Sequence, residues 1–136
     1  MSPILLDTHV AIWSSQGLVA KKLGSVIDEA AKNGELLLSP ISAWEVGILV
    51  RKRRFSITMS LDDYVRTLFS RPGVVTAILT PAIAAASTML PDSVGSDPAD
   101  RLLVATAAAY GATLVTRDAQ IRAFAKATRY VRCIAC

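Results

Sequence analysis

DPADRLLVATAAAYGATLVTRD, residues 97–118, combines an acidic helix start, a very apolar helix and a short strand. Asp97 and Pro98 are typical of the first positions of a helix and Gly111 of its end, so we predict a helix over residues 98–110. A strand is predicted at residues 113–116, and Asp118 follows it after one arginine. This acid-flanked helix and strand predict an α/β unit with carboxylates at one edge of a sheet.

The rest of the chain repeats this alternation. Short apolar runs predict strands at residues 4–6, 36–38, 74–79, 113–116 and 130–134. Apolar spacing and helix-start residues predict helices at residues 9–14, 19–32, 41–54, 61–70, 81–90, 98–110 and 118–127, with a polar loop at 91–96. Strands that alternate with helices predict a doubly wound parallel α/β sheet of about five strands flanked by helices, as a single domain over residues 1–136.

The composition is that of a globular protein. Apolar residues make up 52% of the chain, and no apolar run reaches the ~18 to 20 residues of a membrane helix. The first residues lack the basic segment of a secretory signal, so we expect a cytoplasmic protein without a membrane partner. The formal net charge of +4 is too small to indicate nucleic-acid binding by itself. Cys133 and Cys136 lack further zinc ligands nearby and are interpreted as free thiols.

Four acids occupy matching places along the chain. Asp7 follows the first predicted strand, and Glu45 lies early in the helix after the second. Asp100 lies in the first turn of the helix before the fourth strand, and Asp118 follows that strand. Ligands of open α/β sheets bind at the carboxyl ends of the strands, so these side chains are expected to meet there.

Each acid also has a purely structural interpretation. Asp7, Asp97 and Asp118 suit helix N-caps, and Asp100 suits the positive end of a helix dipole. Residues 42–45, Ser-Ala-Trp-Glu, fit a capping box. Taken singly, capping is favoured for each acid, but capping does not explain why four acids come to one sheet edge. Carboxylates brought together repel, and a hard divalent cation such as Mg²⁺ or Mn²⁺ removes that cost.

Four segments resemble the signature segments of PIN-domain nucleases, and most closely the VapC-type toxins of toxin–antitoxin modules. These segments are residues 5–9 (LLDTH), 42–45 (SAWE), 97–107 (DPADRLLVATA) and 114–118 (LVTRD). The resemblance spans the chain, in order and in spacing. It implies a Mg²⁺- or Mn²⁺-dependent endoribonuclease that works as the toxin of a toxin–antitoxin pair.

The resemblance also assigns roles to residues. Asp7, Glu45, Asp100 and Asp118 match the acidic catalytic and metal-binding positions, with Asp97 as an additional metal ligand on the same helical face as Asp100. Two further residues, Thr116 and more weakly Thr8, resemble supporting hydroxyl residues. The implied partners are an RNA substrate, a cognate antitoxin protein and a second copy of the chain.

Several basic residues are candidate RNA contacts. They are Arg51, Lys52, Arg53, Arg54, Arg101 and Arg117. A solvated helix end explains residues 51–54 equally well, and Arg101 could instead neutralise Asp97 or Asp100. His9 is interpreted as a turn residue, and Trp13 and Trp44 as core or dimer packing.

The sequence is also compatible with two other functions. One is a non-catalytic RNA-binding or interaction protein of the same fold, and the other is a housekeeping PIN nuclease without an antitoxin. A receiver-type phosphoacceptor domain is disfavoured because residues 130–133 lack the lysine that it needs. A dehalogenase-type phosphatase needs D-x-D after the first strand, and residues 7–9 read Asp-Thr-His.

Overall fold

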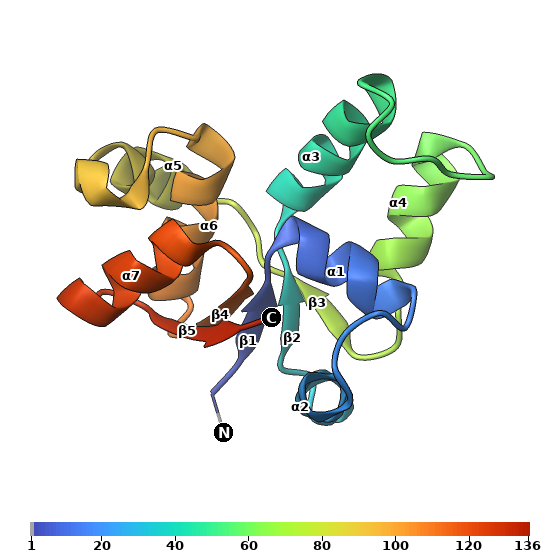
Figure 1. The fold of residues 1–136 in the computed structure, drawn as a ribbon, viewed down its shortest axis with the longest axis horizontal. Coiled ribbons are helices and arrows are strands. Elements are labelled where there is room, and N and C mark those ends of the chain that lie inside the picture. Colours follow the sequence, from blue (N-terminus) through green and yellow to red (C-terminus); the bar gives the residue numbers. More distant parts are fainter. Residues whose placement is uncertain (1) are drawn as a thin grey trace.

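Five parallel strands form a single sheet in the order β3-β2-β1-β4-β5 (Figure 1). The computed structural model describes residues 2–136, so Met1, the first residue of the predicted domain, lies outside the described part. The strands are β1 Ile4–Leu6, β2 Leu36–Leu38, β3 Val74–Thr76, β4 Thr113–Thr116 and β5 Arg132–Ala135. Every neighbouring pair is parallel, which confirms the predicted doubly wound α/β fold.

Helices connect the strands as predicted. They are α1 Thr8–Ser15, α2 Lys21–Lys32, α3 Pro40–Arg51, α4 Leu61–Phe69, α5 Pro81–Thr88, α6 Pro98–Ala109 and α7 Ala119–Thr128, with a short 3₁₀ helix, η1, at Asp92–Val94. Most starts are fixed by a capping side chain. The hydroxyls of Ser39, Ser60 and Thr80 each accept a hydrogen bond from a backbone N–H in the first turn of α3, α4 and α5.

Several predicted bounds differ from the structure. Helix α2 begins two residues later than expected, α5 ends two residues earlier, and β5 covers residues 132–135 instead of 130–134. The strand expected at residues 74–79 stops at Thr76, because its partner strand β2 ends at Leu38. The last hydrogen bond between these segments runs from the Ala77 N–H to the Leu38 carbonyl oxygen. The helix expected to reach residue 54 ends at Arg51, since Arg53 has a φ of 57°. The polar loop at residues 91–96 contains η1, whose Val94 is buried.

The sheet separates two apolar cores, as strand alternation requires. Leu5 and Leu37 face one core, which Leu103 and Phe124 complete from α6 and α7. The intervening side chains of β1 and β2 face a second core built with α1, α2 and α4, where Ile27 is fully buried. Figure 1 shows α5, α6 and α7 on one side of the sheet and α1, α2 and α4 on the other.

Strands β1 and β4 lie side by side at the centre of the sheet, and the direction in which successive strands are added to the sheet reverses between them. The Asp7 N–H donates to the Val115 carbonyl oxygen at 3.0 Å, so the two strand ends are joined directly. Such a reversal point is where open α/β sheets place their ligands. Among residues 2–136, no helix is both long and apolar enough to span a bilayer.

Candidate active site

Asp7 is held at the end of β1 by two hydrogen bonds. Its Oδ1 accepts from the Thr8 N–H at 2.6 Å, and its Oδ2 accepts from the Thr116 hydroxyl at 2.7 Å. Burial raises the pKa of the Asp7 carboxyl, and the nearby Asp118 charge raises it further, while the Thr116 and Thr8 hydrogen bonds and His9 act in the opposite direction. The site therefore keeps a largely desolvated carboxylate in one orientation.

Glu45 points from α3 towards α1. Its Oε1 accepts a hydrogen bond from the buried Thr8 hydroxyl, which also lies 2.9 Å from the Ser42 hydroxyl. Burial raises the pKa of Glu45 and the Thr8 bond lowers it, with the charges of Asp7 and Asp97 adding to the rise. The capping-box interpretation of residues 42–45 is wrong because Ser39 caps α3.

Ser42 is the supporting residue that sequence reasoning missed. It is fully buried and contacts Thr8, which in turn orients Glu45. Its spacing of three from Glu45 places both on one face of α3, and that spacing was the available signal.

Asp97 and Asp100 share the start of α6. Asp97 is the N-cap, and its Oδ1 accepts from the Asp100 N–H at 3.1 Å. The half-buried Asp100 carboxyl has its pKa raised to about 7, first by burial and then by the charges of Asp97, Asp7, Asp118 and Glu45. The four neighbouring acids therefore lie near enough to Asp100 to oppose its ionisation.

Asp118 caps α7 and is tied to the same centre. Its Oδ1 accepts from the Ile121 N–H at 2.9 Å, and its own N–H donates to the Thr116 hydroxyl oxygen at 3.0 Å. The single Thr116 side chain thus connects Asp7 with Asp118. Asp7, Asp97 and Asp118 each cap a helix and also lie in the group of acids. The capping role and the site role of these residues are therefore compatible.

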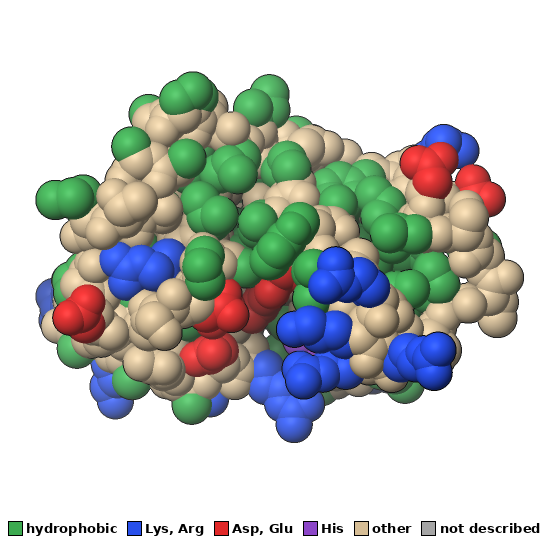
Figure 2. Space-filling model, turned by 90° about the horizontal axis from the view of Figure 1, so that it is seen from above, with side chains coloured by type: hydrophobic (Ala, Val, Ile, Leu, Met, Phe, Trp, Pro, Cys, Tyr) green, Lys and Arg blue, Asp and Glu red, His purple; other side chains and the backbone are tan. Residues whose placement is uncertain are grey.

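All five acids line one open cleft of about 470 Å³. The same cleft is lined by His9, Trp13 and Arg117. Figure 2, seen from above the view of Figure 1, shows acidic side chains gathered in the middle of this face with a group of Lys and Arg side chains beside them.

The donor set suits a hard divalent cation. Carboxylate oxygens are the protein ligands of Mg²⁺ and Mn²⁺. The pKa of Asp100 is raised first by burial and then by the neighbouring carboxylates, and a bound cation would offset both effects. Within residues 2–136, no three His, Cys, Asp or Glu side chains are already drawn together into a ready ligand set. The acids therefore share a cleft rather than a closed coordination shell.

Arg101 does not neutralise the neighbouring acids, and that interpretation was wrong. Its guanidinium donates to five backbone carbonyl oxygens, those of Ser87, Thr88, Leu90, Pro91 and Gly95. A guanidinium has five N–H donors, so the protein uses all of them. Arg101 thereby fixes the connection from α5 to α6. Its side chain has no N–H group left for the RNA contact that was predicted from the sequence.

The other basic candidates remain accessible. The side chains of residues 51–54 are exposed at and beyond the end of α3, and that of Arg117 is exposed at the cleft. Trp44 is 57% exposed, so the core interpretation of this residue was wrong. Cys133 and Cys136 are free thiols, and burial raises the pKa of Cys133 to about 11.

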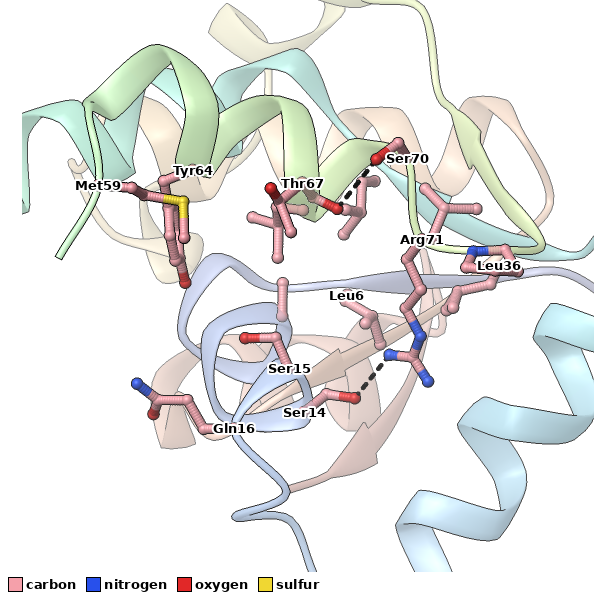
Figure 3. Close-up of a pocket in the computed structure, with 15 residues that line it drawn as sticks. Leu6, Ser14, Ser15, Gln16, Leu36, Met59, Tyr64, Thr67, Ser70 and Arg71 are labelled. Atoms are coloured by element: carbon pink, nitrogen blue, oxygen red, sulfur yellow. Dashed lines mark hydrogen bonds between the residues drawn. The ribbon is translucent and has the colours of Figure 1, made fainter. Parts of the chain in front are cut away.

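A larger cavity of about 700 Å³ lies between α1, α4 and the sheet, away from the acids (Figure 3). Leu6, Leu36 and Leu68 contribute to its mostly apolar lining. At its edge, Arg71 donates to the Ser14 hydroxyl at 2.9 Å. None of the predicted site residues lines this cavity.

Known proteins resemble this chain in both sequence and fold. The PIN domain family matches residues 4–127. The chain is 35% identical to Ribonuclease VapC22 of Mycobacterium tuberculosis over 123 residues, which is 90% of this chain and 92% of that protein.

Two solved structures share the fold. VapBC2 from Rickettsia felis, bound to a DNA fragment from its promoter, superposes with a TM-score of 0.71 at 17% identity, covering 97% of both chains. A toxin–antitoxin complex from Klebsiella pneumoniae gives 0.61 at 19% identity, covering 88% of this chain and 90% of that one. With a family match over most of its length and an acidic cleft at the sheet reversal, this chain belongs to the PIN domain family.

Proposed function

We propose that this protein is a metal-dependent endoribonuclease that acts as the toxin of a toxin–antitoxin pair. The observation that carries the proposal is the single cleft lined by Asp7, Glu45, Asp97, Asp100 and Asp118. The relative named a ribonuclease, 35% identical over most of both chains, supports RNA as the substrate. The structural neighbours described as VapBC2 and as a toxin–antitoxin complex support the antitoxin partner.

The five acids would have two different roles in the reaction. Asp7, Asp97, Asp100 and Asp118 would hold Mg²⁺ or Mn²⁺, and Glu45 would complete the shell or orient the attacking water. A bound ion of this kind supplies a more acidic water and offsets the charge that develops on the phosphodiester. The Thr116 hydroxyl keeps Asp7 in place, and the Thr8 hydroxyl, backed by Ser42, does the same for Glu45.

The partners follow from the same proposal. An antitoxin would bind the toxin and block the cleft, and the chain would form a homodimer. Trp44 and Met89, which are 57% and 83% exposed, are candidates for a surface that a second protein chain covers.

An RNA-cleavage assay tests the proposal directly. We expect single-stranded RNA to be cut by the wild type with Mg²⁺ or Mn²⁺, and not with EDTA or by the Asp7→Asn variant. As a matched control, Asp92→Asn changes an exposed acid outside the cleft and should cut normally.

Each outcome separates the candidate functions. Cleavage that survives EDTA would reject the metal mechanism, and RNA binding without cleavage would favour the non-catalytic alternative. A neighbouring reading frame for a small DNA-binding protein would favour the toxin over a housekeeping nuclease.

A further inference from the structure

Arg117 occupies an unusual place for a cation. It lies between Thr116 and Asp118 in the connection from β4 to α7 and lines the cleft that the five acids share. Its guanidinium carbon lies over the Trp13 ring, 5.1 Å from the ring centre. Trp13 in turn packs against His9, one turn earlier on α1, with ring centres 5.5 Å apart.

The guanidinium of Arg117 stays off the neighbouring carboxylates. Among residues 2–136, the side-chain ion pairs join Arg66 to Asp62 and Asp63 and Arg71 to Asp28, and none involves Arg117. Its N–H groups also donate no hydrogen bond to another described residue. Arg101 differs in this respect, because all of its donors are used by carbonyl oxygens.

Stacking explains how an arginine can remain unpaired beside five acids. A cation over an indole face is attracted by the ring, and this attraction holds the guanidinium at the face of Trp13. Trp13 sits on α1, whose N-cap is Asp7, so the aromatic ring and the acid are positioned by the same element. The carboxylates thus stay available for a cation, and the arginine stays available for an anion.

From this geometry we infer that Arg117 binds a backbone phosphate of the RNA strand beside the cleaved bond, and that Trp13 positions Arg117 by holding it off the carboxylates. The inference rests on the proposed ribonuclease function. A cleft lined by five acids repels a polyanion wherever no cation intervenes, and Arg117 supplies a cation at the wall of that cleft. Because a phosphate contact carries no base information, Arg117 adds affinity without sequence choice.

RNA binding tests the role of Arg117. The Asp7→Asn variant serves as an uncut background, and its affinity for a fluorescein-labelled single-stranded RNA is measured by anisotropy with Mg²⁺ at several salt concentrations. Adding Arg117→Ala should raise the Kd about tenfold and lower the salt slope by about 0.7, as expected for one lost phosphate contact. Arg132→Ala is the matched control. Arg132 is the first residue of β5, level with the start of β4, and so lies at the opposite end of the strands from the cleft.

Metal binding tests the role of Trp13. By calorimetry with Mn²⁺, Trp13→Leu should weaken the affinity about fivefold, because the released Arg117 then pairs with the carboxylates. Trp13→Phe keeps an aromatic face and should bind Mn²⁺ within about twofold of the wild type. The double variant Trp13→Leu/Arg117→Ala should recover the affinity of Arg117→Ala alone, which a merely structural loss at Trp13 would not produce.

The results distinguish this inference from the ribonuclease proposal. If the wild type cuts RNA and Arg117→Ala binds RNA as well as Arg132→Ala does, the inference is overturned and the function stands. If Arg117→Ala weakens RNA binding but the wild type never cuts, the phosphate contact stands and the ribonuclease proposal falls. A double variant that remains as weak for Mn²⁺ as Trp13→Leu would overturn the positioning role of Trp13.

Discussion

The surroundings of Asp100 clearly oppose the ionisation of its carboxyl group. Its pKa rises from 3.8 to about 7 through burial and four nearby carboxylates. The folded, metal-free protein therefore holds a proton that the unfolded chain releases near pH 4. As pH rises from about 4 through 7, the native state loses this advantage, so the contribution of Asp100 to stability falls with increasing pH.

A pH series on Asp100→Asn measures that contribution. In EDTA, the variant should gain about 1 to 2 kcal/mol over the wild type between pH 5 and pH 8, a value reduced from the full linkage because Asp100 is only half buried and solvent screens it. Urea unfolding at both pH values gives the difference. An equal gap at pH 5 and pH 8 would show that Asp100 ionises normally.

At the scale of elements, the connection from α5 to α6 determines where two of the acids lie. The sequence of residues 91–96 predicted a polar loop. Within it η1 forms, and Arg101 donates to carbonyl oxygens from Ser87 to Gly95. Its bonds to Ser87 and Thr88 also satisfy carbonyl groups in the last turn of α5. One side chain thus closes α5 and anchors the segment that leads to Asp97.

Replacing Arg101 should loosen this connection. Arg101→Ala is expected to lower the free energy of unfolding by about 2 to 3 kcal/mol, and Arg101→Lys should recover only part because an ammonium has three donors and no planar fork. Urea unfolding compares both with Arg66→Ala, which removes exposed ion pairs to Asp62 and Asp63 and should cost roughly 0 to 1 kcal/mol. A loss at Arg101 no larger than that at Arg66 would contradict the anchoring role.

At the scale of the whole molecule, the strand order makes the site. The β3-β2-β1-β4-β5 order places β1 beside β4, so Asp7 and Asp118 are neighbours although 111 positions separate them in the chain. Helix α3, after β2, brings Glu45, and α6, before β4, brings Asp100 to the same edge. Since each half of the sheet supplies acids, binding of an ion in the cleft would stabilise the complete fold.

Thermal unfolding with added Mg²⁺ tests this coupling. At a free concentration of about 100 times Kd, a ligand of the native state adds about 2.7 kcal/mol, which corresponds to roughly 5 to 10 °C in Tm for a chain of this size. The rise should be small in Asp7→Asn and unchanged in Asp92→Asn. An equal rise in all three proteins would place the ion outside the cleft.

Local sequence determined the positions of most strands and helix starts. Apolar runs, capping side chains and a helix-ending glycine such as Gly111 each act over only a few residues. The strands at residues 4–6, 36–38 and 113–116 were predicted with their observed bounds, and capping roles for Asp7, Asp97 and Asp118 were also foreseen. The early end of β3 depended on how far its partner strand extends, which no local pattern contains.

The tertiary structure alone decided how the two arginines beside the acids are used. Arg101 and Arg117 both adjoin an acid in sequence, yet one is consumed by five carbonyl oxygens and the other stacks on Trp13. Their partners lie in other elements, so only the packing of the helices around the sheet could distinguish them. Local preferences specify where an acid or an arginine sits on its own element, whereas distances between elements determine what its charge meets.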